Sequence, residues 1–173
     1  MERMTNIIRI VKCVSGILLV VCFFLPWVAQ TPSCTDKSVI IRDNISGYTL
    51  VREGTAPEAL AAPLFGAVVA GIALIVRRRT VPLAASLVSL AEIPAALIIA
   101  AYVDLSVRLF TPFIVRYGYV VTAALFWAIP LLSLSEVIIH FPRLTRVGKI
   151  IVSAAAGLLA ALALIDYLSR FIG

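Results

Sequence analysis

Acidic residues lie inside long apolar stretches of this sequence, where a charged side chain is costly and often marks a functional site. Glu92 is near the middle of the stretch 81–103. Basic residues are not expected at that depth, so burial should favour the neutral acid. Ser89 precedes Glu92 by one helical turn and could hydrogen-bond with it. Glu92 and Ser89 therefore form either a protonatable or ion-binding site, or a polar contact with another helix or subunit.

Glu136 and His140 form a second candidate pair. They are four residues apart, which places them on one face of a helix near the end of its apolar stretch. Two interpretations remain open: a proton relay, or an interfacial pair that also contacts Arg143. His140 is the only histidine, and the three cysteines contain no CxxC spacing. We therefore expect no metal site and no cofactor.

Two prolines lie at similar depth in the apolar stretches. Pro94 follows Glu92 by two residues, and Pro130 is near the middle of the stretch 118–139. Proline removes a helical hydrogen bond, so we expect kinks at both positions. Transporter sites are often built from interrupted helices beside an acid, although prolines are also common in ordinary membrane helices.

The sequence contains none of the common catalytic motifs. Nucleophile-elbow, P-loop, dinucleotide-binding and zinc-protease patterns are all absent. Catalysis would depend on Glu92, Glu136, His140 and scattered serines. We therefore do not expect an enzyme.

The elements that position these residues are expected to be membrane helices. The chain is 62% hydrophobic and 14% charged, whereas soluble domains are about 45–50% apolar and about 25% charged. Five stretches are long enough to cross about 30 Å of hydrocarbon as helices. We therefore predict a single-domain, all-α membrane protein with five spans at about 7–29, 60–76, 81–103, 118–139 and 149–172.

The segment 30–58 is the one sizeable loop between these spans. Residues 38–42 and 47–52 are rich in β-branched and aromatic residues, and 43–47 carries turn residues. This pattern predicts a short β-hairpin outside the membrane.

Two other segments leave an alternative open. The loop 104–117 is apolar and flanked by tyrosines, so we expect it to lie along the headgroups or to contact another subunit. The stretch 60–76 is the shortest, and a four-span chain with this segment re-entrant is the alternative to five spans.

Small residues recur at every fourth position in two of the spans. Such faces let helix backbones approach closely, within the chain or between chains. The residues are Gly66 and Ala70, Ala67 and Gly71, and then Ser153, Gly157 and Ala161.

The basic residues predict the orientation of the chain. With the N-terminus inside, nine basic residues lie on the inner side against Glu2 alone, whereas the outer side has a net charge of about +1. This asymmetry explains the basic composition without nucleic acid, so no nucleic-acid partner is expected. The inner residues are Arg3, Arg9, Lys12, Arg77, Arg78, Arg79, Arg143, Arg146 and Lys149.

Residues 18–52 carry a recognisable pattern. The run Phe23–Val28, with the letters FFLPWV, is followed by Cys34 and by the segment Ser46–Leu50, with the letters SGYTL. This combination resembles small, uncharacterised bacterial polytopic membrane proteins. The resemblance implies a multi-pass protein of the bacterial cytoplasmic membrane and implies little about activity.

Our leading functional hypothesis is a non-catalytic accessory or scaffold subunit that packs beside other membrane proteins or copies of itself. It depends on five spans with little aqueous mass and on the lack of a catalytic set. The alternative is a small transporter, channel or proton-coupled component that uses Glu92 beside Pro94 and Pro130. Expected partners are the lipid bilayer and membrane protein subunits.

Overall fold

The structure is a computed structural model that describes residues 2–30, 44–79, 82–109 and 113–172. It contains six α-helices, two short 3-10 turns and three strands in the described ranges. In chain order these are α1 (Glu2–Cys22), β1 (Pro26–Gln30), β2 (Ile45–Ser46), α2 (Gly47–Arg52), η1 (Pro57–Leu60), α3 (Ala61–Arg79), α4 (Pro82–Leu109), β3 (Phe113–Val115), α5 (Tyr117–His140), η2 (Phe141–Arg143) and α6 (Arg146–Ile172).

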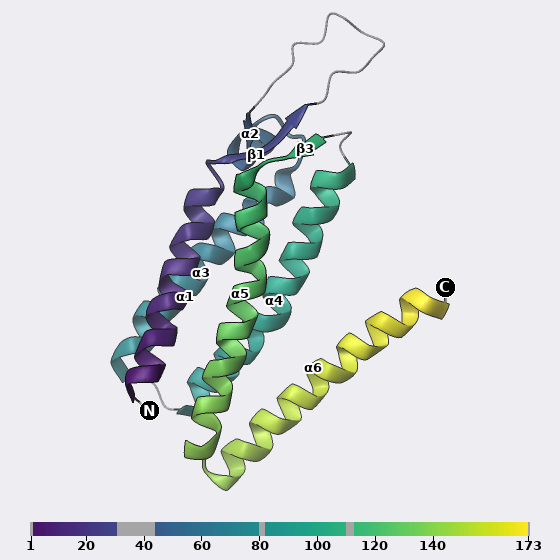
Figure 1. Ribbon diagram of the computed structural model, residues 1–173. Helices are drawn as coiled ribbons and strands as arrows, with labels where there is room; N and C mark the ends of the chain where they lie inside the picture. Colours follow the sequence, from purple (N-terminus) through teal and green to yellow (C-terminus); the bar gives the residue numbers. More distant parts are fainter. Residues whose placement is uncertain (1, 31–43, 80–81, 110–112, 173) are drawn as a thin grey trace, which may run out of the picture.

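Helices α1, α3, α4 and α5 lie side by side in an elongated bundle (Figure 1). The strands and α2 cover one end, which we call the sheet end; the N-terminus and the turn between α5 and α6 lie at the other, which we call the corner end (Figure 1). Within the described residues, four helices are long and apolar enough to cross a bilayer. They span Arg3–Cys22, Pro57–Ile75, Pro82–Leu105 and Tyr117–Arg143. These features indicate a helical membrane protein.

The predicted end of the first span, at residue 29, is wrong. Helix α1 ends at Cys22, and Pro26–Gln30 forms strand β1 instead. Pro26 cannot continue a helix because its ring clashes with the preceding turn and its nitrogen carries no proton. The indole of Trp27 is fully buried and donates a 2.7 Å hydrogen bond to the carbonyl oxygen of Cys22.

Three short strands form a sheet in the order β2-β1-β3, with antiparallel pairing. The predicted β-hairpin is wrong in its second strand because Gly47–Arg52 is helix α2. Ser46 caps this helix, since its hydroxyl accepts a 3.2 Å hydrogen bond from the Thr49 amide. The predicted first strand, 38–42, lies outside the described residues.

The apolar loop 104–117 also differs from the expectation. Helix α4 continues to Leu109, and Phe113–Val115 forms β3, paired with β1 through Ala29 and Ile114. The segment is therefore partly helix and partly strand at the sheet end. Helix α3 continues through residues 61–79 without interruption, which favours a full span over a re-entrant segment.

A close backbone contact joins α1 and α3. A Cβ atom added at Gly66 would lie 2.5 Å from the carbonyl oxygen of Gly16, so only glycine fits there. Ala70 contacts Gly16 from the next turn of α3. The predicted small-residue face of Gly66 and Ala70 therefore packs inside the chain, whereas nothing lies within 4 Å of a Cβ at Gly71.

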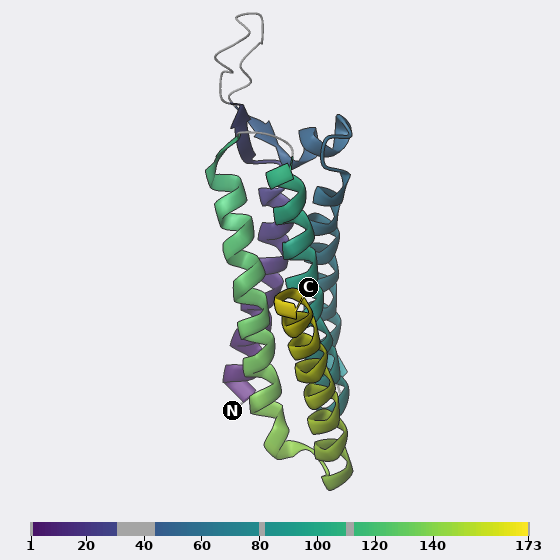
Figure 2. The same ribbon diagram turned by 90° about the vertical axis from the view of Figure 1, so that its right-hand side faces the viewer.

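The main apolar core occupies the sheet end and middle of the bundle. Leu19, Val69 and Ile129 are fully buried there, and the rings of Phe65 and Phe126 stack with centroids 5.8 Å apart. Helix α6 begins against α4 and α5 and then runs away from the bundle (Figures 1 and 2). Its first half packs in a separate apolar cluster through Val152, beside Leu90.

Candidate functional site

Lys12 is the centre of a buried polar cluster in the bundle. It lies halfway along α1, with a side chain that is 4% exposed, and its ammonium group points between α4 and α5. Burying an unpaired ammonium in a medium of low dielectric constant is very costly, so Lys12 must be paired. Its acidic partners come from two other helices.

Glu92 of α4 is the first of these partners. Its Oε2 atom forms an ion pair with the Lys12 ammonium and accepts a 2.7 Å hydrogen bond from the Ser133 hydroxyl of α5. The expectation that Glu92 has no charge partner within the chain is therefore wrong. Glu92 joins α1, α4 and α5 at about mid-depth of the bundle.

Glu136 of α5 is the second acidic partner. Its Oε2 atom lies 3.1 Å from Lys12 Nζ and accepts a 3.0 Å hydrogen bond from the hydroxyl of Ser89. Its Oε1 atom accepts a 3.0 Å hydrogen bond from Arg9 Nε. Ser89 and Glu92 thus belong to the same cluster, but Ser89 donates to Glu136 rather than to Glu92.

His140 extends the cluster toward the corner end. Its Nε2 atom lies 3.4 Å from Arg9 Nη2 and 3.8 Å from Glu136 Oε1. Glu136 and His140 do share a helix face, as predicted. The cation that contacts both is Arg9 of α1, and not Arg143, which is exposed on the η2 turn. Both side chains are buried and face the interior of the bundle, and the position of the pair at the membrane interface stays a prediction.

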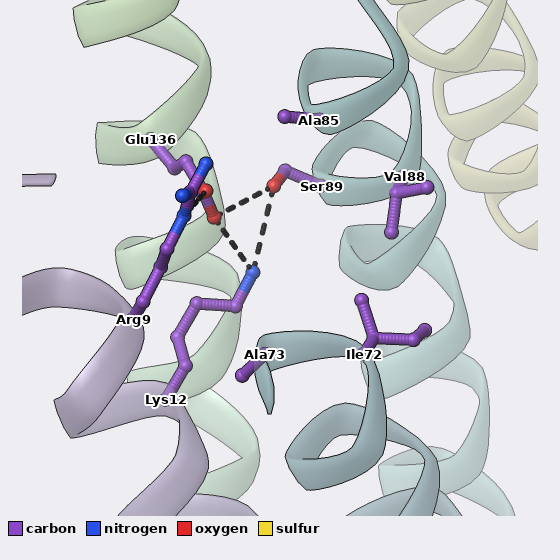
Figure 3. Close-up of a pocket in the computed structure, with 8 residues that line it drawn as sticks. All are labelled: Arg9, Lys12, Ile72, Ala73, Ala85, Val88, Ser89 and Glu136. Carbon is purple, nitrogen blue, oxygen red and sulfur yellow. Dashed lines mark hydrogen bonds and ion pairs between the residues drawn. The ribbon is translucent and has the colours of Figure 1, made fainter. Parts of the chain in front are cut away.

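The cluster is close to electroneutral. Arg9 and Lys12 are balanced by Glu92 and Glu136 when His140 is neutral. Figure 3 shows the side chains of Arg9, Lys12, Ser89 and Glu136 converging from α1, α4 and α5. They line a cavity of about 10 Å³, which is about the space that one water molecule needs. Ion pairing and hydrogen bonding across three helices offset the cost of taking these charges out of water.

Two buried atoms of the cluster have no hydrogen-bond partner among the described residues. They are Glu92 Oε1, at mid-depth, and His140 Nδ1, near the corner end. Glu92 Oε1 is an unpartnered acceptor, whereas His140 Nδ1 is a donor in the neutral ring, because His140 Nε2 must accept from the Arg9 guanidinium. An ordered water molecule at either atom would complete its hydrogen bonding.

Neither proline interrupts its helix. Helices α4 and α5 continue through Pro94 and Pro130. In a bundle, neighbouring side chains and small local adjustments satisfy the backbone groups that proline frees. The helices are therefore continuous at both prolines, so Glu92 does not lie at a helix break; the kinks expected at Pro94 and Pro130 stay a prediction.

Arg9 and Lys12 were predicted to lie at the inner membrane edge with the other basic residues, but the side chains of both point into the bundle. A signal for this was present in the sequence. Thr5, Lys12 and Ser15 share a helix face with Leu19, and all four are buried. A polar stripe along an otherwise apolar helix predicts that this face points into the bundle.

The chain matches no protein-family model, and comparisons with characterised proteins and with solved structures find no match.

Proposed function

We propose that this chain is a non-catalytic scaffold or accessory subunit of a membrane protein complex. The observation that supports it best is the mutual pairing of the intramembrane charges. Arg9 and Lys12 are paired with Glu92 and Glu136 across three helices, around a cavity no larger than one water molecule. A balanced set of this kind holds helices together, and binding a further ion there would break an existing pair.

The uninterrupted helices favour the same function. In many transporters, substrate and ion sites lie at discontinuous helices whose free backbone groups face the ligand. Here α4 and α5 remain helical through Pro94 and Pro130, beside a paired acid. Glu92 therefore fits a structural contact between helices better than an ion-coordinating site.

The proposed topology has five spans, with the N-terminus inside and the C-terminus outside the plasma membrane. Helix α6, at 27 residues, would be the fifth span. The charge asymmetry persists after Arg9 and Lys12 are assigned to the buried cluster. Seven basic residues then remain for the corner end against Glu2: Arg3, Arg77, Arg78, Arg79, Arg143, Arg146 and Lys149.

A face of α6 supports assembly with other subunits or with a second copy. Ser153, Gly157 and Ala161 are all exposed, and nothing in the described chain lies within 4 Å of a Cβ at Gly157. Small residues spaced in this way allow another helix to approach closely. The comparable residue Gly66 uses this property inside the chain.

Affinity purification of the tagged full chain in mild detergent, after cross-linking in its native membrane, tests this proposal. Gly157→Leu should abolish the cross-linked assembly, because a large side chain keeps the partner helix away. Gly71→Leu is the matched control, since a Cβ at Gly71 also meets open space but on α3. If both variants retain every cross-linked product of the wild type, the proposed assembly face is wrong.

A proton-coupled component is the second candidate, because Glu92 Oε1 is buried without a partner in the described chain. In that case, proton flux through liposomes that contain only this chain would be lost in Glu92→Gln. A scaffold should show no such flux.

A further inference from the structure

The described interior of the bundle is polar in its corner half and apolar in its sheet half. The charge cluster around Lys12 fills the corner half as far as Glu92. One turn beyond Glu92, toward the sheet end, the interior is formed by fully buried apolar side chains, which include Val69, Ala96 and Ile129. Water that approached the cluster from the sheet end would have to cross this apolar layer, which offers it no hydrogen bonds.

Two spaces adjoin at the corner half of the bundle. One is the water-sized cavity of about 10 Å³ inside the cluster, and the other is a groove of about 180 Å³ between α1 and α3. Arg9 and Ala73 line both of them, and Figure 3 shows these two side chains at the cavity. The groove also includes Asn6, which is exposed near the start of α1. A route for water therefore leads from the corner end to the cluster.

Two buried polar atoms indicate that water occupies the cluster. Glu92 Oε1 and His140 Nδ1 have no hydrogen-bond partner in the described chain, although their side chains are only 5% and 7% exposed. Buried polar atoms are nearly always hydrogen-bonded, either to protein or to ordered water. A water molecule can donate to the carboxylate oxygen and accept from the ring nitrogen, so it can satisfy both kinds of atom.

We propose that water reaches the charge cluster from the corner end only, through the groove between α1 and α3, and extends no further than Glu92. One water molecule fills the cavity, and others bind Glu92 Oε1 and His140 Nδ1. Glu92 and Glu136 therefore exchange protons with the compartment at the corner end and not with the compartment at the sheet end. This one-sided access goes beyond the scaffold function, and it predicts no flux across the membrane.

The charges around this water come from three sides of the cavity. Helix α3 contributes the apolar side chains Ile72 and Ala73. The ionisable groups are Arg9 and Lys12 on α1, Glu92 on α4, Glu136 and His140 on α5, and Arg143 on η2. Each proton that a carboxylate takes up from water adds one positive charge to a cluster that is otherwise close to neutral. The charge of the cluster therefore follows the pH of the corner-end compartment alone.

Protection of single cysteines by silver ions tests the access route. The silver ion is about as large as a water molecule, and it binds soft thiolate sulfur tightly. Ser133→Cys and Ala96→Cys place a thiol beside Glu92 and one turn beyond it, and both native residues are fully buried. Each is made in the full chain with Cys13, Cys22 and Cys34 replaced by alanine. Silver is added to one side of sealed vesicles of known orientation, and free thiols are counted with a maleimide after unfolding.

Silver at the corner end should protect Ser133→Cys at least about tenfold faster than silver at the sheet end, because crossing the apolar layer requires local opening of the bundle. Ala96→Cys should react slowly from both sides. Ala73→Leu, which narrows the junction of groove and cavity, should slow protection of Ser133→Cys from the corner end. Ala67→Leu is the matched control, since Ala67 is exposed on α3 and lines neither space.

Equal rates from the two sides, or equal rates for Ser133→Cys and Ala96→Cys, would overturn the proposal. No protection of Ser133→Cys from either side would overturn it as well, since the cluster would then be dry. Ser89→Cys, which lines the cavity, provides the same comparison if circular dichroism shows that Ser133→Cys does not fold. None of these results bears on cross-linking through Gly157, so this proposal and the scaffold proposal can fail separately.

Discussion

The pairing of Lys12 with Glu92 makes a double-mutant cycle the most informative perturbation of this fold. Glu92→Gln leaves two buried cations, Arg9 and Lys12, to share the single carboxylate of Glu136. Lys12→Met leaves Glu92 with only the hydroxyl of Ser133 among its described partners. Each single variant therefore carries one uncompensated buried charge or must neutralise it by a change of protonation.

The cost of each single substitution should be large. Removing one partner of a buried ion pair typically costs about 3–5 kcal/mol, because the other charge stays buried. The double variant Lys12→Met/Glu92→Gln leaves the pair of Arg9 and Glu136 intact and the cluster neutral again. Its free energy of unfolding should therefore lie within about 1.5 kcal/mol of the wild type, which corresponds to a coupling energy of at least about 4.5 kcal/mol.

The assay is reversible unfolding of the purified chain in mixed micelles by increasing fractions of sodium dodecyl sulfate, followed by circular dichroism. Glu58→Gln is the control, because Glu58 is exposed at η1, and it should change the free energy of unfolding by less than about 0.5 kcal/mol. Additive effects of Lys12→Met and Glu92→Gln, with no coupling energy, would refute the conclusion that the two charges stabilise each other.

Two further predictions concern packing and helix capping. Gly66→Ala should destabilise the chain by about 1–3 kcal/mol, because the added methyl group meets the Gly16 carbonyl oxygen. Gly71→Ala on the same helix should be neutral, because its methyl group meets open space. Both free energies of unfolding are measured by the same assay, and equal effects would contradict the close contact between α1 and α3. Ser46→Ala should cost about 1 kcal/mol, because it removes the hydroxyl that accepts a hydrogen bond from the Thr49 amide, and Ser46→Asn should restore the cap. Hydrogen exchange of the amides at the start of α2 measures the effect. Unchanged protection of these amides in Ser46→Ala would exclude the cap.

The long helices could be predicted from the sequence because apolar length alone specifies them. Helices α3, α4 and α5 begin within about one residue of the predicted spans. Helix α5 also ends where it was predicted to within about one residue, whereas α3 and α4 end later than predicted. The pair of Glu136 and His140 could be predicted as well, since a four-residue spacing places them on one helix face.

The short elements at the sheet end could not be predicted in the same way. The run after Pro26 is too short for its pattern to separate a strand from the end of a helix. Residues 47–52 have β-branched side chains but follow Ser46, and the cap together with burial of Leu50 favours a helix. Tertiary contacts therefore determine the secondary structure of Pro26–Gln30 and of Gly47–Arg52.

The partner of Glu92 could not be predicted from the sequence either. Lys12 and Glu92 are 80 residues apart, and their contact depends on how α1 and α4 pack. Lys12 also resembles the basic residues that mark the inner membrane edge, and this similarity concealed its buried position. The polar stripe that it forms with Thr5 and Ser15 was the available signal.

The most direct test of the central claim, that the buried charges hold the bundle together rather than conduct ions, is a flux measurement. The purified full chain is reconstituted into liposomes, and proton and alkali-cation fluxes are measured under an imposed gradient and membrane potential. We predict fluxes equal to those of protein-free liposomes for both the wild type and Glu92→Gln. A proton or cation flux in the wild type that Glu92→Gln abolishes, while Glu58→Gln preserves it, would contradict the claim.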